Sequence, residues 1–279
     1  MPLSLQPFDA PLGAEVGGFD PRTISADDFA ALLQALAHHG VLVLRDQHLT
    51  PAELVAFSRR FGDIEYHVLD QFWLEEQPEI YVISNIVENG KPIGNPREGF
   101  GWHTDLSYMA LPTAYTFLYG LEVPDEGADT LFCTVYPTTD ALPSTERARL
   151  EAITVRHSYA MLHASRPWAP PLTEQQKARS PDVFHPLMRT HPLTGRKGVY
   201  LGGATCSIPL DMDEQEGMAL MQRLYDDATR PEHCYAHKWR RHDLVFWDNR
   251  GVMHSATEYD RDRYRRLIHR TSVRGEKPY

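Results

Sequence analysis

The sequence predicts a mainly β fold with flanking helices, arranged as a double-stranded β-helix, or jelly roll. Short runs rich in β-branched and aromatic residues dominate the middle and the end of the chain, as expected for strands. Helical periodicity is clearest near the N-terminus and in one late segment. Antiparallel sheets packed face to face, with helices outside them, account for that order. Because no repeat or compositional break divides the chain, we expect one domain over residues 1–279.

The first quarter of the chain predicts two helices with a strand between them. Ser25 precedes apolar residues at helical spacing, and Gly40 ends that pattern. The continuous apolar run at 41–44 then predicts a buried strand. The tetrapeptide at 50–53, threonine-proline-alanine-glutamate, has the form of a capping box with proline at the first helical position. A second helix is therefore expected to run to about residue 60.

The remaining regular elements are mostly strands. One short helix is expected from 143 toward 153, and a longer amphipathic helix from 211 to 230. The face of the longer helix expected to be buried carries Met218, Met221, Leu224 and Tyr225. Aromatic and β-branched content predicts strands at 80–83, 115–119, 130–135, 199–201, 235–239, 243–247 and 266–273.

Two segments are interpreted as loops near a functional site. Residues 84–101 are rich in Asn, Gly and Pro and lie directly before His103, so we expect an active-site loop there. Residues 165–186 contain five prolines and are expected to be irregular. The span 160–186 is therefore interpreted as a lid or an insertion.

Bulk composition excludes several classes of partner. The formal net charge of -10 argues against nucleic acid and against an anionic membrane surface. The three cysteines show no C-x-x-C spacing, which favours a reducing compartment over a disulfide framework. We find no signal peptide and no apolar run of about 18 residues that could span a membrane. The expectation is a soluble cytoplasmic protein that acts on a small molecule.

The stretch 101–108 carries the first chemical signal. His103 and Asp105 are two residues apart, so on an extended chain both side chains would point to the same face. One imidazole and one carboxylate make two-thirds of the 2-His-1-carboxylate triad that holds non-haem Fe(II). The pair occurs by chance in many loops, so the interpretation needs a third ligand.

His254 is the candidate third ligand. It follows a strand that ends in a polar turn, and it lies within a short apolar step, Val252 to Ala256. A ligand delivered from a strand is held rigidly, as a metal site requires. The alternative is a core histidine that donates to a backbone carbonyl, and the residues around His254 do not decide between these two roles.

Arginines near the C-terminus supply a candidate anion site. A solvated basic face is the default explanation for a run of arginines. Arg266 and Arg270, however, lie among residues of strand composition, and on a strand they would share one face. A buried guanidinium needs an anionic partner and fits a carboxylate bidentately. Two inward arginines would suit two anionic groups, one on a cosubstrate and one on a substrate.

Several different short motifs are spread over nearly the whole chain. Taken together and in this order, they resemble those of the Fe(II)/2-oxoglutarate-dependent dioxygenases of the taurine dioxygenase and phenoxyacetate dioxygenase group. The main motifs are Trp102-His103-Thr104-Asp105, Gly127-Ala128-Asp129-Thr130, Trp247-Asp248-Asn249-Arg250 followed by His254, and Arg265-Arg266-Leu267-Ile268-His269-Arg270.

The resemblance implies a role for each candidate residue. It makes His103, Asp105 and His254 the iron ligands, with no catalytic residue beyond the metal centre. It also implies O2 as a reactant, release of succinate and CO2, and hydroxylation or cleavage of a small anionic substrate. Relatives form oligomers, so a homo-oligomer is expected. The roles implied for the remaining residues are 2-oxoglutarate binding by Thr130 and Arg266, and substrate binding by Arg270 and His67.

The substrate is less well defined. Asp70 and Gly99 stand where the taurine enzymes have tyrosine and asparagine, which argues against taurine. The stretches 129–133 and 189–203 resemble the phenoxyacetate enzymes more closely, which favours a carboxylate. Two other classes remain as alternatives: a metal-binding jelly-roll protein that binds a small acid without turnover, and a zinc hydrolase. The hydrolase lacks a clear general base and leaves both arginines without a role.

Overall fold

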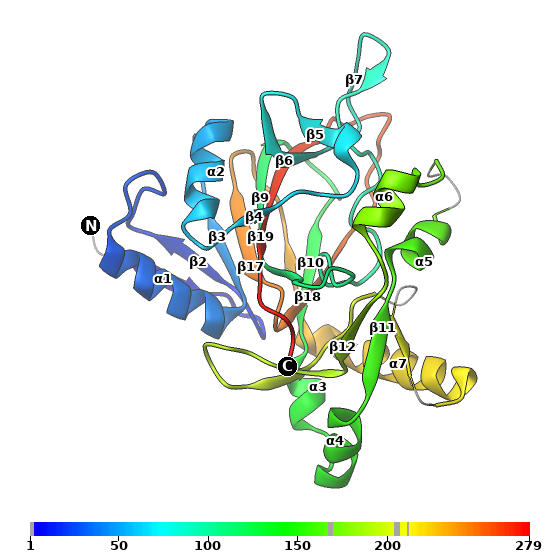
Figure 1. The fold of residues 1–279 in the computed structure, drawn as a ribbon. Coiled ribbons are helices and arrows are strands. Elements are labelled where there is room, and N and C mark those ends of the chain that lie inside the picture. Colours follow the sequence, from blue (N-terminus) through cyan, green and yellow to red (C-terminus); the bar gives the residue numbers. More distant parts are fainter. Residues whose placement is uncertain (1–2, 167–169, 204–206, 211) are drawn as a thin grey trace.

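The structure is a computed structural model that describes residues 3–166, 170–203, 207–210 and 212–279. A large sheet, nine-stranded among the described residues, forms its centre (Figure 1). All pairings in this sheet are antiparallel except that of β2 with β3. In spatial order its strands are β1 (Ser4–Pro7), β2 (Ala14–Gly17), β3 (Val41–Leu44), β17 (Leu244–Asp248), β9 (Thr113–Glu122), β19 (Leu267–Arg274), β6 (Gln77–Ser84) and β5 (Trp73–Leu74), with β4 (Ile64–Glu65) also paired to β19.

Smaller antiparallel sheets complete the β structure. The sheet that carries a candidate ligand has the order β16, β10, β18, so His254 lies on an edge strand beside β10. These strands are β16 (Cys234–His237), β10 (Thr130–Thr134) and β18 (Val252–Ala256). The others are β11 (Thr154–His157) with β12 (Val183–Pro186) and β15 (Ser207–Pro209), β13 (Met188–Thr190) with β14 (Lys197–Val199), and β7 (Val87–Glu88) with β8 (Lys91–Pro92).

The two N-terminal helices form as expected and cover the outer face of the large sheet (Figure 1). Helix α1 (Ala26–His39) begins after Ser25, whose hydroxyl caps Asp28 N–H, and ends at Gly40 with φ of 74°. Helix α2 (Pro51–Arg59) begins with the complete capping box between Thr50 and Glu53.

Successive side chains of the central strands point to opposite faces of the large sheet, so the core lies on both faces. On β3 and β17, Leu42 and Phe246 pack with the side of the sheet that α1 and α2 cover. Their neighbours Val43 and Trp247 point the other way and pack with Phe132 of β10. Both faces of these strands are therefore buried, which is why the sequence shows continuous apolar runs there.

Two details of the sequence interpretation were wrong. The span 165–186 is not irregular throughout, because it contains α6 (Glu174–Arg179) and β12; its residues 167–169 lie outside the described residues. In α7 (Glu214–Ala228), Met218 is 61% exposed, since the buried stripe passes through Gly217 and Met221 instead. The other helices are α3 (Tyr136–Asp140), α4 (Ser144–Glu151) and α5 (Tyr159–Ala164), with short 3-10 turns at η1 (Asp70–Phe72) and η2 (Pro231–His233).

No helix in the described part of the chain is both long enough and apolar enough to cross a bilayer.

Candidate metal centre

His103 and His254 are brought together by backbone pairing. The N–H of each residue donates to the carbonyl of the other, and both N–O distances are 3.0 Å. This is an isolated antiparallel bridge between the 101–105 stretch and β18. Side chains of directly opposite residues in such a pair lie on the same face, and here the ring centroids are 4.1 Å apart. The pairing of two segments far apart in sequence thus places two imidazoles side by side.

Asp105 reaches the same point from a turn. The condition that the chain is extended between His103 and Asp105 does not hold, because the chain turns at Asp105 and Leu106 has φ of 48°. The Asp105 carboxylate nevertheless faces both rings, 3.8 Å from His103 Nε2 and 3.7 Å from His254 Nε2. One ligand atom from each of the three residues lies within 4.8 Å of the others. This spacing fits three ligands of a single ion.

The orientation of one imidazole and the neutrality of the other suit metal binding. His103 Nδ1 donates to the Gly101 carbonyl at 2.7 Å, which leaves Nε2 facing Asp105. Burial lowers the pKa of His254 to about 3, with His103 acting in the same direction, which keeps that ring neutral. Two imidazoles and one carboxylate form the donor set typical of non-haem Fe(II).

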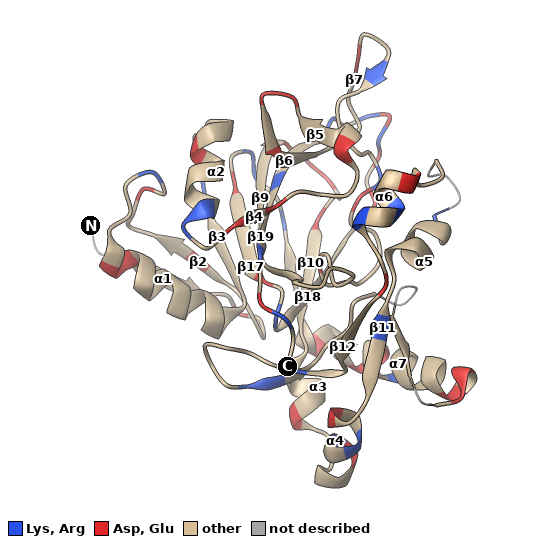
Figure 2. Ribbon diagram, viewed as in Figure 1, with Lys and Arg blue, Asp and Glu red and all other residues tan. Residues whose placement is uncertain are grey.

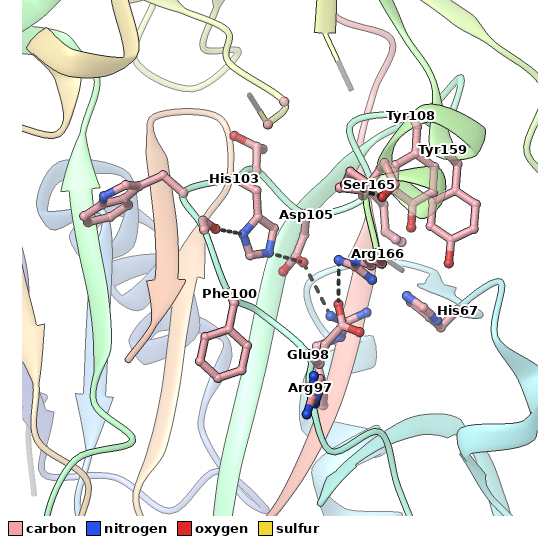
Figure 3. Close-up of a pocket in the computed structure, with 18 residues that line it drawn as sticks. His67, Arg97, Glu98, Phe100, His103, Asp105, Tyr108, Tyr159, Ser165 and Arg166 are labelled. Atoms are coloured by element: carbon pink, nitrogen blue, oxygen red, sulfur yellow. Dashed lines mark hydrogen bonds and ion pairs between the residues drawn. The ribbon is translucent and has the colours of Figure 1, made fainter. Parts of the chain in front are cut away.

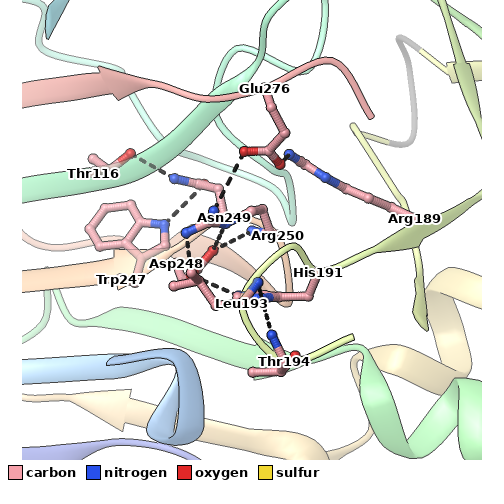
Figure 4. A network of polar contacts seen from close by, with 10 residues as sticks. All are labelled: Thr116, Arg189, His191, Leu193, Thr194, Trp247, Asp248, Asn249, Arg250 and Glu276. Carbon is pink, nitrogen blue, oxygen red and sulfur yellow. Dashed lines mark hydrogen bonds and ion pairs between the residues drawn. The ribbon is translucent and has the colours of Figure 1, made fainter. Parts of the chain in front are cut away.

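A network of hydrogen bonds fixes the Asp105 carboxylate. Thr116 Oγ1 on β9 donates to Asp105 Oδ2 at 2.7 Å, and Asn249 Oδ1 accepts from the Asp105 N–H at 3.1 Å. Asn249 Nδ2 also donates to Thr116 Oγ1 at 2.9 Å, while Trp247 Nε1 donates to Asn249 Oδ1 at 3.1 Å (Figure 4). The sequence interpretation gave Asn249 and Thr116 no role. Asn249 stands in a motif that was noticed, whereas nothing in the sequence marks Thr116.

A second polar network anchors the end of β17. Asp248 accepts from both the Nε and Nη2 of Arg250, at 2.7 and 2.8 Å, and from His191 Nε2 at 2.9 Å. Glu276 Oε1 accepts from Arg189 and Glu276 Oε2 from Arg250 (Figure 4). Burial alone would raise the pKa of Asp248, but Arg250 and His191 hold it well below its usual range. Because Asn249 follows Asp248 directly, this network also fixes the residue that holds Asp105.

A pocket opens beside the three candidate ligands. It has a volume of about 220 Å³, and its wall includes His67, Glu98, Arg166 and Arg270 (Figure 3). Gly202 forms part of the wall, and a Cβ there would overlap Ser107 and His157, so the close approach requires glycine.

Arg270 lies against the metal side of the pocket. The side chain is buried, and Nη1 is 3.5 Å from Asp105 Oδ1. Its Nη2 has no hydrogen-bond partner among the described residues. Burial raises the pKa of Asp105, but Arg270, His254 and His103 more than offset this and hold the pKa well below its usual range. The site therefore combines an ionised carboxylate with a guanidinium that still has a donor free.

His67 faces the same pocket as a neutral imidazole. Burial lowers its pKa to about 3, with Arg270 acting in the same direction. His67 Nδ1 accepts from Leu69 N–H at 3.1 Å, so Nε2 carries the proton and can donate. Its ring lies 4.0 Å from the ring of Tyr81.

Thr130 and Arg266 occupy a different part of the barrel. Among the described residues, neither lines the 220 Å³ pocket. Thr130 is buried on β10, where its hydroxyl accepts from Trp239 Nε1 at 3.0 Å. Arg266 is buried directly before β19, and its Nε has no partner within the described part of the chain. Burial lowers the pKa of this guanidinium to about 10, which indicates that a charge is held there without a compensating anion.

A β barrel that directs two imidazoles and one carboxylate at a single point, next to buried arginines, defines a metal-dependent oxygenase. Comparison with known proteins agrees. The family model described as "Taurine catabolism dioxygenase TauD, TfdA family" matches residues 4–272. The chain belongs to this family and is an Fe(II)/2-oxoglutarate-dependent dioxygenase that uses a small-molecule substrate.

Individual relatives support the family and the fold. The chain is 34% identical to pentalenolactone F synthase of Streptomyces arenae, over 90% of this chain and 88% of the relative. It is 32% identical to the (S)-phenoxypropionate/alpha-ketoglutarate-dioxygenase of Sphingobium herbicidovorans, over 96% and 93% of the two chains. The crystal structure of AAD-2 in complex with Mn(II) and N-oxalylglycine superposes with a TM-score of 0.84 at 28% identity, covering 100% of this chain and 99% of that chain. The predicted double-stranded β-helix is confirmed.

Proposed function

We propose that the protein oxidises a small anionic organic substrate, a carboxylate rather than a sulfonate, by hydroxylation or by cleavage that follows hydroxylation. Succinate and CO2 are the coproducts. The observation that carries this proposal is the cluster of His103, Asp105 and His254 next to the unpartnered donor of Arg270.

His103, Asp105 and His254 would hold the iron. When bound, iron and 2-oxoglutarate supply the oxidising chemistry that consumes O2. Protein side chains supply position and exclude water. The Gly101 carbonyl orients the His103 ring, and Thr116 with Asn249 orients the carboxylate. Ligands held in this way lose little freedom when the ion binds.

Arg266 and Thr130 would bind the distal carboxylate of 2-oxoglutarate. A buried guanidinium with a free Nε suits a carboxylate, because a charged hydrogen bond restores the solvation that burial removed. The Thr130 hydroxyl accepts from Trp239, so its own proton remains available for a second acceptor.

Arg270 and His67 would bind the anionic end of the substrate. Arg270 has a free Nη2, and neutral His67 offers a donor at Nε2. Asp70 stands where the taurine enzymes have tyrosine, but its side chain is 42% exposed and pairs with Arg179 at 3.1 Å. This environment differs from that of a substrate-binding tyrosine and supports a substrate other than taurine. The phenoxypropionate relative favours a carboxylate.

Residues 84–101 and 160–186 would act as an active-site loop and a lid. Glu98 and Phe100 of the first segment line the pocket together with Leu162 and Arg166 of the second. A single domain, a homo-oligomer and a cytoplasmic location stay predictions from the sequence.

The decisive experiment follows iron loading and turnover separately. Anaerobic protein is mixed with Fe(II) and 2-oxoglutarate, and a weak visible charge-transfer band is expected. Oxygen is then admitted with a panel of carboxylates and sulfonates, and succinate is measured. Substrate-dependent succinate supports the proposal, with carboxylates the more active class. No band and no succinate across the panel would favour the binding protein without turnover.

The two arginine roles can be separated by variants. Arg266→Ala should raise the apparent KM for 2-oxoglutarate far more than that for substrate, because loss of a buried charged hydrogen bond costs about 2–5 kcal/mol. Arg270→Ala should raise the apparent KM for the substrate far more than that for 2-oxoglutarate. Arg265→Ala is the matched control, since Arg265 is exposed and pairs with Glu122 at the surface. Equal effects of Arg266→Ala and Arg270→Ala on both ligands would show that the assignment is wrong.

A further inference from the structure

A buried carboxylate lies in the wall of the anion pocket. Glu98 is 7% exposed, and its Oε2 accepts from Asn95 Nδ2 at 2.6 Å and from the Tyr81 hydroxyl at 3.2 Å. Asn95 is itself fixed, because its backbone pairs with Val82 and Ser84 of β6. Glu98 therefore has a defined position in a loop that is otherwise largely exposed.

Glu98 is close to the substrate end of the pocket. Tyr81, which donates to Glu98, is the cross-strand partner of Arg270, and the Arg270 guanidinium lies 4.8 Å from the centre of its ring. One tyrosine thus contacts both the proposed substrate guanidinium and this carboxylate.

Arg166 provides a second cation on the same wall. It follows α5, and its Nη2 is 3.8 Å from Glu98 Oε1, an ion pair without a hydrogen bond. The Arg166 side chain is 16% exposed, so solvent screens this pair only in part. Burial would raise the pKa of Glu98, but Arg166, followed by His67 and Arg270, lowers it. The carboxylate is ionised at neutral pH.

The charges of the described residues on this wall leave one cation in excess. Arg270 and Arg166 carry two positive charges, Glu98 carries one negative charge, and His67 is neutral. Arg97 also lines the pocket but is exposed to solvent, which screens its charge. Asp105 belongs to the metal centre. A substrate with one negative charge would neutralise the wall, whereas a second charge would face Glu98.

We propose that Glu98 is a specificity-determining residue that restricts the pocket to monoanionic substrates by neutralising Arg166. The inference rests on the proposed function, because it takes this cavity as the substrate pocket. Arg270 then supplies the charge that binds the substrate, and Glu98 supplies the repulsion that rejects a dianion. Selectivity of this kind needs an unfavourable element as well as an attractive one.

The test uses two probes of the same shape that differ by one charge. Phenylmethanesulfonate has one negative charge, and phenylmethylphosphonate has two above its second pKa. Their dissociation constants are measured by calorimetry on protein loaded with Mn(II) and N-oxalylglycine, at a pH above that pKa. Wild-type protein should bind the sulfonate more tightly. Glu98→Gln keeps an acceptor for Asn95 and Tyr81 and should shift the affinity ratio toward the phosphonate by about tenfold or more.

Two further variants separate charge from structure. Arg166→Met should shift the ratio in the opposite direction, since Glu98 would then face Arg270 without a compensating cation. The double variant of Glu98→Gln with Arg166→Met should return the ratio to near the wild-type value. Glu88→Gln removes an exposed carboxylate from the hairpin in the same loop and is the matched control, with no shift expected.

Each outcome decides the inference. An unchanged ratio in Glu98→Gln, shifts of the same sign in both single variants, or failure of both probes to bind wild-type protein would overturn it. The ratio is an equilibrium property that needs no turnover. The expected shifts without any succinate formation would therefore count against the proposed function and leave the charge selection intact.

Discussion

The two sides of the pocket are built in different ways. On the metal side, Asp105 makes hydrogen bonds of 2.7 and 3.1 Å to Thr116 and Asn249, which lie on or next to central strands. On the substrate side, Glu98 and Arg166 approach at 3.8 Å without a hydrogen bond, and both come from segments outside regular elements. The sheet core therefore holds the metal side, whereas Glu98 and Arg166 on the proposed substrate side come from loops.

This difference suggests that the metal side determines the reaction, whereas the loops determine which substrate is accepted. A ligand geometry that is shared by a family needs the rigidity of packed strands. Substrate preference can vary through loops without disturbing the core, because loops tolerate substitution. Variants on the two sides should therefore differ in both the size and the kind of their effects.

The largest effect is expected from removal of the proposed carboxylate ligand. Asp105→Ala should abolish Fe(II) binding and turnover, because two imidazoles alone leave the donor set incomplete. Metal content after equilibrium dialysis measures the loss, and circular dichroism checks that the fold remains. Iron retained at wild-type affinity would show that Asp105 is no ligand.

The next largest effect concerns stability. Asp248→Asn should lower the free energy of unfolding by about 3–5 kcal/mol, because it removes the bidentate charge partner of buried Arg250 and leaves only Glu276, 3.5 Å away. Asp248 has a lowered pKa, so its contribution is present above its ordinary pKa of 3.8 and is lost as the pH falls below that value. Urea unfolding between about pH 3 and about pH 7 should show a steeper loss of unfolding free energy at low pH in wild type than in Asp248→Asn. Equal pH slopes would contradict this account.

A smaller, more specific effect is expected at Thr116. Thr116→Val removes the hydroxyl that donates to Asp105 and should weaken metal binding by about 10–100-fold, as is typical for residues that orient ligands. Thr116→Ser keeps the hydroxyl and should bind metal nearly as wild type does. Mn(II) affinity measured by calorimetry distinguishes the two. If both variants bind equally well, Thr116 does not position the carboxylate.

The smallest effect is expected on the loop side. Arg179 of α6 pairs with Asp70 at 3.1 Å, with side chains 34% and 42% exposed. Arg179→Ala should change the free energy of unfolding by about 1 kcal/mol or less, since solvent screens such pairs. Thermal unfolding of wild type and Arg179→Ala measures this change in free energy. A loss as large as that of Asp248→Asn would remove the contrast between the two sides.

The sequence predicted helices and strands well where the residues that determine them lie within the same segment. The serine cap and Gly40 define α1, and the capping box at 50–53 defines α2. Apolar runs predicted β3 and β17 because both faces of these strands are buried. Helices α5 and α6 were missed because each spans only six residues, so its formation depends on packing against the rest of the molecule; prolines on both sides of α6 also obscured that helix.

Residue type made His103, Asp105 and His254 candidate ligands, and the resemblance of the ordered motifs to the dioxygenases joined them as a set. Their convergence was decided by tertiary pairing: a bridge between His103 and His254, followed by a turn at Asp105. Thr116, Glu98 and Arg166 acquire their roles only through neighbours distant in sequence. The physical reason is that donor chemistry resides in each side chain, whereas distance and local charge arise only when separate segments pack together.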